Sequence, residues 1–462
     1  MPGPLILVNA VGLTTRLLPH APRLQRLAQT RGCQPLAEVL PAVTCTAQAS
    51  LLTGTPPAGH GIVANGWLYR ETMEVRFWQQ SNRLLQAEPL YATARRRAAA
   101  QGRAFSCAKL FWWFNQGADV DFSVTPKPHY GADGNKAFGI TGRPEGLTKE
   151  LEQRLGPFPF PSFWGPLAGR PATEWIARAA AEVLTQHRPD LTLVYLPHLD
   201  YDPQRFGPSR CDLARCVGEL DAAFGLIESA AAAFGANVWV VSEYGHVDVR
   251  RPVYLNRALR AAGLLRVRHG PFGEMLETFE SSALAVCDHQ MAHVYVNDAK
   301  QMPKVRAVLE ALPGVAQVRS GAARADWHLD HPRSGDLILQ AAPEAWFAYP
   351  YWEDDRRAPD FARTVDIHRK PGFDPCELFL DPRLWWPRLR MVRRLVQKKL
   401  GFRTLFDVIP LDATLVGGSH GLAAADPLDA PVLLGAGGDP GRRLPMTDVR
   451  DRVLQALDLA DV

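Results

Sequence analysis

Short, uninterrupted apolar runs alternate with amphipathic helical patterns along most of this chain. Residues 191–196 (LTLVYL) and 237–241 (NVWVV) have the length of strands and contain no charged residue, and a shorter run occupies 5–8. Strands covered on both faces have this composition in parallel sheets. Helical patterns fall between these runs at 22–30, 44–53, 89–100, 173–186 and 211–234. The alternation predicts an α/β fold with a doubly wound, mostly parallel sheet.

The rhythm changes between residues 266 and 400. Strand-like runs follow one another there at 289–296, 315–319, 336–340 and 346–349, with one helical pattern at 300–311. From 416 onwards the α/β pattern returns and includes the apolar run 431–434. With 462 residues the chain can hold a large domain and an insertion. We therefore predict a core formed by 1–265 and 401–462, and a smaller inserted α+β cap at 266–400.

Composition excludes several classes of protein. The formal net charge of +4 gives no sign of a nucleic-acid binder. Seven scattered cysteines without a CxxC pair indicate neither a zinc ribbon nor a disulfide framework, and they fit a reducing cytosol. The N-terminal apolar run is too short and lacks the basic start of a signal peptide, and no run is long enough to span a membrane. We expect a cytoplasmic protein without a transmembrane segment.

One basic segment, residues 386–403, combines Arg and Lys with apolar residues at helical spacing. A solvated helix is the default interpretation, and a surface that contacts a membrane or an acidic partner is the alternative. The apolar positions of this segment are Leu389, Val392, Leu395, Val396 and Leu400.

Polar residues follow three of the expected central strands. Asn9 ends the first, Asp200 and Asp202 follow the run at 191–196, and Glu243 with His246 follows the run at 237–241. Ligands of open parallel sheets gather at the carboxyl ends of the strands. These side chains are therefore expected to converge on one rim.

Residues 41–65 (PAVTCTAQASLLTGTPPAGHGIVAN) contain a helix start that can join the same rim. Thr44 lies at that start, where the backbone N–H groups lack partners and the helix dipole favours an anion such as a phosphoryl group. An ordinary capped helix is the alternative interpretation.

The same segment resembles the nucleophile region of the nucleotide pyrophosphatase/phosphodiesterase branch of the alkaline-phosphatase superfamily. In that branch a threonine nucleophile precedes an L-x-T-G run that continues into P-x-x-H-G-I-x-x-N. The matching residues here are Thr44, Thr53, Gly54, Pro57, His60, Gly61, Ile62 and Asn65. The resemblance implies an alkaline-phosphatase-like fold and a phosphoester hydrolase that forms a covalent intermediate on Thr44. It also implies two divalent cations that clamp the phosphoryl group.

The resemblance implies seven positions for the metal site, and this chain departs from the pattern at several. The positions are filled by Asn9, Thr44, Asp200, Gln204, Glu243, Tyr244 and His420. Thr44, Asp200 and His420 match the pattern, and Glu243 is a conservative replacement. Asn9 and Gln204 offer only neutral oxygens, and Tyr244 is a poor ligand with an ordinary pKa of about 10.

These departures suggest a reorganised metal site. Asp202 and His246 could join Asp200, Glu243 and His420 to hold one divalent cation or two, with Zn or Mn the best fit to the ligand types. Each histidine taken alone could equally be a hydrogen-bonded structural residue.

The substrate side of the pattern is better preserved. The resemblance gives Asn65 and the backbone N–H of Cys45 a role in binding phosphoryl oxygens, and Gln48 is the amide side chain of the first helical turn. Cys45 ranks below Thr44 as a nucleophile. The aromatic run 111–114 either lines a pocket, with Trp112 and Trp113 contacting substrate, or packs in the core. Lys136 could meet an anionic group.

Three functions are consistent with these observations. The first is metal-dependent hydrolysis of a small phosphodiester or phosphate-type ester through Thr44. The second is a phosphotransferase or phosphonate-cleaving relative that acts on a non-nucleotide substrate. The third is a metal-poor, non-catalytic protein that binds a phosphorylated ligand.

Overall fold

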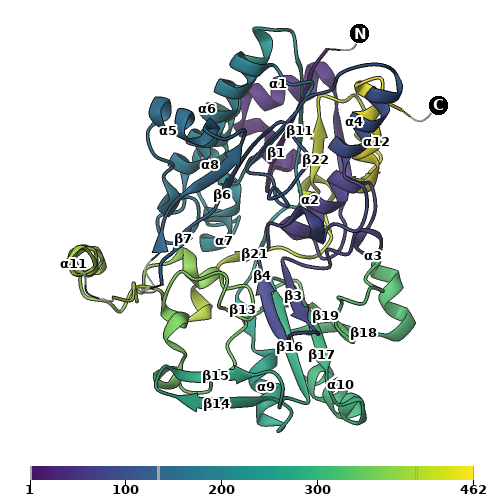
Figure 1. Cartoon of the computed structure of the whole chain (residues 1–462). Coiled ribbons are helices and arrows are strands. Elements are labelled where there is room, and N and C mark those ends of the chain that lie inside the picture. The colour runs from purple at the N-terminus through teal and green to yellow at the C-terminus, as the bar shows by residue number, and fades with distance from the viewer. Residues whose placement is uncertain (1–2, 133–135, 401, 403, 461–462) are drawn as a thin grey trace.

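The computed structural model of the protein describes residues 3–132, 136–400, 402 and 404–460. Its largest element is a nine-stranded sheet with the order β23-β2-β22-β11-β1-β10-β5-β6-β9 (Figure 1). The strands are β1 (Leu5–Ala10), β2 (Cys33–Ala37), β5 (Cys107–Leu110), β6 (Phe122–Pro126), β9 (Ile140–Arg143), β10 (Leu191–Leu196), β11 (Asn237–Val241), β22 (Val432–Leu434) and β23 (Leu444–Pro445). The central strands β11, β1, β10, β5 and β6 are all parallel, whereas β22 and β9 run antiparallel to their neighbours. The predicted fold class is confirmed.

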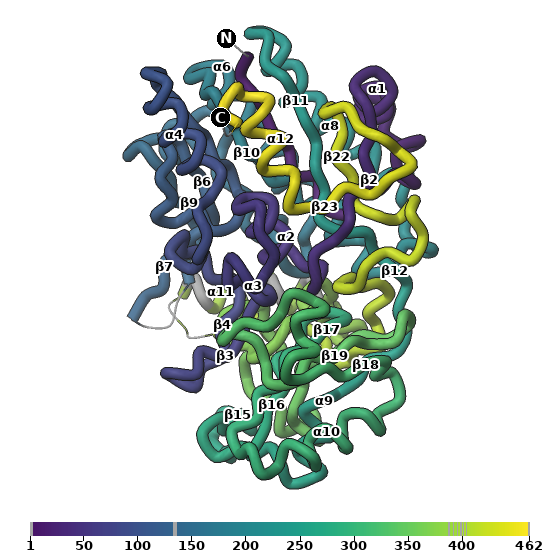
Figure 2. The backbone as a smooth tube through the Cα atoms, turned by 90° about the vertical axis from the view of Figure 1, so that its right-hand side faces the viewer, coloured from purple at the N-terminus to yellow at the C-terminus, as the bar shows by residue number. Residues whose placement is uncertain are grey.

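Helices cover both faces of this sheet (Figures 1 and 2). One face carries α1 (Pro22–Arg31), α6 (Arg170–His187) and α8 (Leu213–Ala232), and the other carries α2 (Thr44–Thr53), α4 (Leu90–Ala100) and α12 (Val449–Ala456). Successive side chains of a strand point to opposite faces. Accordingly Ile6 and Val8 pack with the first set of helices, and Leu5 and Leu7 pack with the second. The uninterrupted apolar composition of the central strands follows from this double coverage.

A smaller antiparallel sheet forms a second layer, in the lower half of Figure 1. Its strands have the order β16-β17-β19-β18, and α9 and α10 pack against it. The elements are β16 (Ala283–Asp288), β17 (Met291–Val296), β18 (Val315–Ser320), β19 (Leu337–Ala341), α9 (Leu255–Ala261) and α10 (Met302–Glu310). We call this layer the cap.

Chain before residue 265 also contributes to the cap. The hairpin of β3 (Gly66–Tyr69) and β4 (Glu74–Phe77) places Trp67 and Phe77 in the same hydrophobic cluster as the small sheet. The hairpin follows directly from the segment that begins with α2, so the Thr44 helix and the cap are joined by a short stretch of chain. The division at residues 265 and 400 stays a prediction.

The aromatic run 111–114 is buried because the chain turns sharply there. Strand β5 ends at Leu110, and Phe111 and Phe114 both have positive φ, 61° and 57°. The turn sends the rings into three different hydrophobic clusters: Phe111 into one, Trp112 into a second, and Trp113 with Phe114 into a third. Core packing therefore accounts for Trp112, which is fully buried.

The turn is held by Lys109, a fully buried residue of β5. Its ammonium donates a hydrogen bond to the carbonyl of Phe114 (2.8 Å) and lies 4.9 Å from the ring centroid of Tyr91. Burial lowers the pKa of Lys109 from 10.5 to about 7.

This buried lysine predicts a specific pH dependence of stability. Between pH 7 and 10.5 the unfolded chain binds more protons at this group than the folded chain, so the free energy of unfolding rises with pH, by at most about 1.4 kcal/mol per pH unit. Urea unfolding of the wild type and of Lys109→Met at pH 7 and pH 9 measures the effect. The rise should be smaller in the variant, and an equal rise in both would contradict the assignment.

Candidate active site

The carboxyl ends of three central strands place polar side chains on one rim. Asn9 lies near the end of β1, Asp200 ends a short 3-10 helix after β10, and Glu243 follows β11. Thr44 is the first residue of α2 and reaches the same place. His420 arrives from the C-terminal part of the chain, directly after β21 (Gly418–Ser419). The structure thus brings Asn9, Thr44, Asp200, Glu243 and His420 to one rim.

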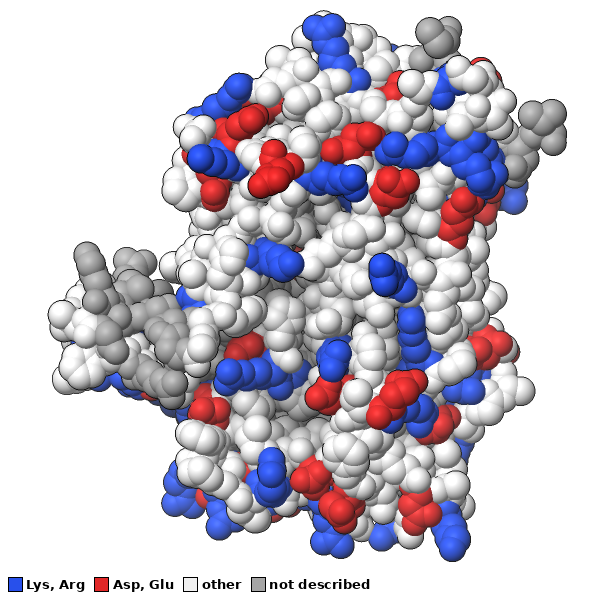
Figure 3. All heavy atoms as spheres, viewed as in Figure 1, with Lys and Arg blue, Asp and Glu red and all other residues white. Residues whose placement is uncertain are grey.

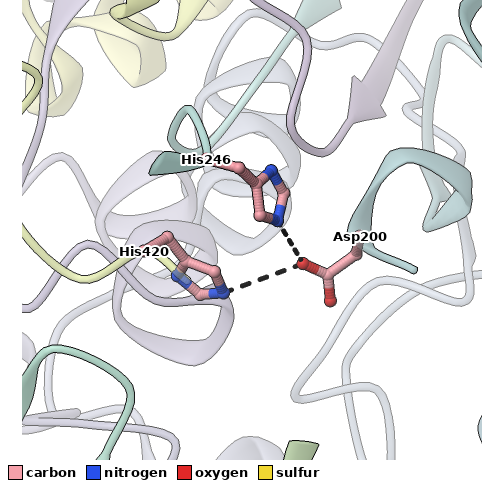
Figure 4. Close-up of side chains that lie close together, drawn as sticks. All are labelled: Asp200, His246 and His420. Atoms are coloured by element: carbon pink, nitrogen blue, oxygen red, sulfur yellow. Dashed lines mark hydrogen bonds and ion pairs between the residues drawn. The ribbon is translucent and has the colours of Figure 1, made fainter. Parts of the chain in front are cut away.

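Asp200, His246 and His420 form a compact group (Figure 4). Their potential ligand atoms all lie within 4.8 Å of one another, and within the described chain this is the one such group of three His, Cys, Asp or Glu side chains. Asp200 Oδ1 is 3.2 Å from His246 Nε2 and 3.7 Å from His420 Nε2. Two imidazoles and one carboxylate are a donor set typical of zinc and similar cations.

The surroundings of His420 fix which of its nitrogens faces the group. Nδ1 donates a hydrogen bond to the carbonyl of Ala42 (2.8 Å), so Nε2 carries the lone pair. Burial lowers the pKa of His420 well below its usual value, so the ring is neutral. Nε2 has no hydrogen-bond partner among the described residues and faces the Asp200 carboxylate. A lone pair directed at a carboxylate is unfavourable, whereas a cation between the two atoms would satisfy both.

His246 packs closely against the loop after β1. Gly12 has φ +75°, and a Cβ at that position would lie 3.0 Å from His246 Cε1. Glycine suits this position, because the backbone is left-handed and a Cβ would crowd the imidazole. On its other side the same ring reaches Asp200 through Nε2.

The hydroxyl of Thr44 begins a chain of hydrogen bonds to the same carboxylate. Tyr244 Oη donates to Asp200 Oδ1 (3.2 Å), and the Thr44 and Tyr244 hydroxyls are 2.9 Å apart. Burial raises the pKa of Tyr244 well above its usual value, so the phenol keeps its proton. Because that proton is directed at Asp200, the hydroxyl of Thr44 donates to Tyr244. Asp200 therefore connects the histidine group to the candidate nucleophile.

A network of amides surrounds Glu243. Its Oε1 accepts hydrogen bonds from Asn9 Nδ2 (2.5 Å) and Gln48 Nε2 (2.7 Å), while Gln48 Oε1 accepts the backbone N–H of Trp113 (2.8 Å). Burial raises the pKa of Glu243 to about 8. Asn9 Oδ1 and Glu243 Oε2 have no partner among the described residues. These two atoms could face a second cation, but the amide donors already balance much of the carboxylate charge.

The backbone after Thr44 is bound to Asn65, and Asn65 is bound to the cap. Cys45 N–H donates to Asn65 Oδ1 (2.9 Å), and Asn65 donates its backbone N–H and its Nδ2 to Asp288 (2.7 and 3.1 Å). Asp288 ends β16 of the small sheet. We call Asn65 and the backbone N–H of Cys45 the cradle. The thiol of Cys45 is fully buried and its pKa is raised well above the usual value, which disfavours it as a nucleophile.

The cap also supplies His289, which sequence analysis did not single out. Its Nδ1 donates to Asp288 Oδ1 (2.8 Å). Its ring stacks on Phe373 at a centroid distance of 3.7 Å and lies 3.8 Å from the His420 ring, tilted by 35°. His420 stacks in turn on Tyr244 at 3.7 Å. Four rings thus form a continuous column from the cap to the rim. Asp288 and His289 carry no sequence signal, because only the register of β16 brings them to the site.

The carboxylate of Asp288 is expected to orient Asn65 for anion binding. Asp288→Asn removes the charge that accepts both hydrogen bonds, so the inhibition constant of inorganic phosphate should rise about tenfold or more. Metal content should not change, because Asp288 contacts none of the three clustered side chains. Asp336→Asn is a matched control, since Asp336 is a cap carboxylate that accepts the backbone N–H of Val296 (2.8 Å). Equal phosphate inhibition of Asp288→Asn and wild type would contradict the orienting role.

A model of the type I phosphodiesterase/nucleotide pyrophosphatase family matches residues 5–374. The chain belongs to this family. The match covers most of the 462 residues and confirms both the resemblance and the prediction of an enzyme of the phosphodiesterase type. Among curated proteins no match is found.

Solved structures similar to this family member share its fold at low identity. Phosphonoacetate hydrolase from Sinorhizobium meliloti, in complex with phosphonoformate, has a TM-score of 0.62 at 17% identity, with 100% of this chain and 96% of that chain covered. Murine ectonucleotide pyrophosphatase/phosphodiesterase 5, an inactive threonine-to-alanine variant in complex with AMP, has a TM-score of 0.60 at 14% identity, with the same coverage. The human protein of that name has a TM-score of 0.58 at 13% identity, covering 99% and 96%.

Other residues predicted from the sequence of this family member lie in different settings. Asp202 does not lie in the group, because its carboxylate pairs with Arg205 and Arg215, each at 2.6 Å. Gln204 is buried, and both atoms of its amide lack partners among the described residues. Lys136 lies in the short strand β8 (Lys136–Ala137), with Nζ 5.8 Å from the ring centroid of Tyr130.

Of the two tryptophans, only Trp113 touches the network around Thr44. Its backbone N–H is bound by Gln48, and its ring lies 5.2 Å from that of Trp78. Trp112 is enclosed in the core and is left out of the proposed site.

Proposed function

We propose that this protein is a metal-dependent hydrolase of small phosphodiesters or related phosphate-type esters, with Thr44 as the nucleophile. The observation that carries the proposal is the group Asp200–His246–His420, which is joined to the Thr44 hydroxyl through Tyr244. The inactive form of the murine structural neighbour is a threonine-to-alanine variant, which supports the choice of a threonine.

One divalent cation, Zn or Mn, would be held by Asp200 Oδ1, His246 Nε2 and His420 Nε2. When bound there it would polarise a phosphoryl oxygen and stabilise negative charge. His246 supplies the imidazole that is missing at Gln204. The lone pair of His420 Nε2, which has no hydrogen-bond partner among the described residues, supports this assignment.

The protein's own groups would carry out a two-step transfer. Thr44 Oγ1 would form a bond to phosphorus while the bond to the leaving oxygen breaks. The Thr44 proton would pass to Tyr244 Oη as Tyr244 gives its own proton to Asp200, and the leaving oxygen would take a proton from solvent. Water would then attack phosphorus, the bond to Thr44 Oγ1 would break, and Thr44 would recover its proton from Asp200 through Tyr244, while the proton of the attacking water passes to solvent. In the cradle, the second N–H of the Asn65 amide would bind an oxygen of the phosphoryl group together with the first N–H groups of α2, and the Cys45 N–H would exchange its bond to Asn65 Oδ1 for one to a phosphoryl oxygen.

A second cation near Asn9, Thr44, Glu243 and Tyr244 would bind more weakly than the first. Asn9→Asp should strengthen it, because two adjacent carboxylates without a cation would repel each other. Metal analysis after incubation with manganese or zinc is expected to give close to one additional equivalent per chain in this variant. Asn256→Asp, at a buried asparagine that bonds to Ala285, is the control. Unchanged metal content in Asn9→Asp would argue against a second position.

Three substrates separate the candidate functions. The purified, metal-loaded protein is assayed with an aryl phosphodiester, an aryl phosphomonoester and phosphonoacetate. Turnover of the diester above that of the others supports the proposal, and turnover of phosphonoacetate alone supports the phosphonate-cleaving alternative, to which the fold of phosphonoacetate hydrolase is similar. Binding of phosphate without turnover of any substrate would support a non-catalytic binding protein.

We also propose a cytoplasmic location. All seven cysteines lie in the described chain as free thiols, including Cys211 and Cys216 with sulfur atoms 3.7 Å apart. Unbonded cysteines at this distance are in keeping with a reducing compartment. Among the described helices, none has the length and apolar character needed to cross a bilayer. Fractionation of cells that express the tagged protein would test the location.

A further inference from the structure

Helix α11 (Pro387–Lys399) stands out from the body of the molecule, at the left of Figure 1. It lies within the basic segment 386–403 identified from the sequence. Residues 401 and 403, and the side chains of Pro387, Arg388, Met391, Leu395, Lys398 and Lys399, fall outside the described part of the chain.

The apolar side of α11 faces solvent. Leu389, Val392, Val396 and Leu400 recur at helical spacing and are 64%, 54%, 51% and 69% exposed. Trp385 and Trp386, directly before the helix, are 92% and 73% exposed. The apolar stripe of a surface helix normally packs against the core. Here it faces away from the protein, and we call these six residues the apolar stripe.

Ion pairs attach the opposite side of α11 to the chain that follows it. Arg390 and Arg394 both pair with Asp407, and Arg394 Nη2 lies 3.0 Å from Asp407 Oδ1. These ion pairs turn the guanidinium groups towards the chain that follows the helix. The outward direction of the apolar stripe is therefore a consequence of how the helix is attached.

The charge of the segment indicates the kind of partner. Residues 382–406 contain eight Lys or Arg and no Asp or Glu, and three of these cations pair with acids just outside the segment: Arg383 with Asp381, and Arg390 and Arg394 with Asp407. Five of the eight remain to give the segment a net positive charge. Elsewhere on the face seen in Figure 3, basic and acidic side chains are interspersed. A basic helix with an apolar stripe is typical of segments that lie at the surface of an anionic bilayer, in the headgroup region. Tryptophan side chains are also enriched in the headgroup region of membranes.

We propose that α11 and the two preceding tryptophans bind face-on to an anionic phospholipid surface. The helix would lie in the plane of the membrane, because 13 residues span only about 20 Å. The apolar stripe would enter the headgroup region while the exposed Arg393 contacts lipid phosphates. An acidic protein would match the charge of the segment, and a second copy of this chain would match the apolar stripe. Neither partner would match the charge, the stripe and the two tryptophans at the helix start at the same time.

Vesicle sedimentation with the full-length protein tests this proposal. We expect binding to phosphatidylcholine vesicles that contain phosphatidylserine, weaker binding to phosphatidylcholine alone, and release as salt is raised. Leu389→Asp/Val396→Asp should lower the partition coefficient at least tenfold while leaving turnover of a soluble aryl phosphodiester and Tm unchanged. Phe272→Asp/Phe279→Asp is the matched control, because both phenylalanines are exposed outside α11.

Three results would overturn the proposal. The wild type could fail to bind anionic vesicles, the α11 variant could bind as well as the wild type, or the control variant could lose binding equally. A wild-type dimer that the α11 variant dissociates, without vesicle binding, would assign the apolar stripe to self-association instead. None of these results depends on the activity proposed above.

Discussion

Replacement of Thr44 by alanine is expected to lower kcat for an aryl phosphodiester by at least about a thousandfold. The hydroxyl is the group that would bond to phosphorus, and its partner Tyr244 cannot replace it because burial keeps the phenol protonated. Metal content should stay unchanged, because Asp200, His246 and His420 are intact. Burst kinetics and metal analysis of the same preparation measure both quantities.

Thr46→Ala is the matched control for this variant. Thr46 lies two residues later in the same helix, is fully buried, and its hydroxyl has no partner among the described residues. It should therefore retain near wild-type turnover. If Thr44→Ala turned over substrate as fast as Thr46→Ala, a covalent intermediate on Thr44 would be contradicted. Direct attack of water on phosphorus would then be the simpler mechanism.

Removal of either clustered imidazole is expected to release the metal. His246→Ala and His420→Ala each leave two of three ligands, so the dissociation constant for zinc should rise at least about a hundredfold and turnover should fall with metal occupancy. Competition with a chromophoric chelator measures the affinity. The two variants should behave alike, because both rings contact the same oxygen of Asp200.

His198→Ala controls for the loss of a buried histidine. His198 lies in the same short helix as Asp200, but its ring pairs with Glu219 (2.9 Å) and does not belong to the group. It should bind zinc like the wild type. If His198→Ala and His246→Ala lost metal to the same extent, the effect would be one of folding, and the assignment of His246 as a ligand would be wrong.

Much of the fold could be predicted from local patterns. The expected boundaries of the helix at 44–53 and of the strands at 191–196 and 237–241 agree with α2, β10 and β11. The two strands are continuous apolar runs, and the helix ends at Gly54, which has a left-handed backbone. The convergence of Asp200, Glu243 and Thr44 followed from a general rule about parallel sheets, so it needed no knowledge of side-chain contacts.

The details of the site could not be predicted in the same way. Asp202 and His246 were equally plausible additional ligands, and the choice between them depends on two arginines beside Asp202 and on the space left by Gly12 beside His246. The burial of Trp112 depends on a turn with positive φ at Phe111, which the composition of the run does not reveal.

The contribution of the cap was also hidden from sequence analysis. Asp288 is 223 residues from Asn65 in the chain, and the hydrogen bonds between them exist only because β16 packs above the rim. No residue pattern near Asp288 resembles the family segment used for the prediction. The role of a residue such as Asp288 can be recognised only from a structure in which the cap and the main sheet are both present.

The proposed activity depends on a metal bound by Asp200, His246 and His420 beside Thr44. Anomalous diffraction from crystals grown with zinc or manganese tests it most directly. We predict a peak about 2.0–2.2 Å from Asp200 Oδ1, His246 Nε2 and His420 Nε2. The absence of a peak there at saturating metal, or a peak bound by other side chains, would contradict the proposed metal site.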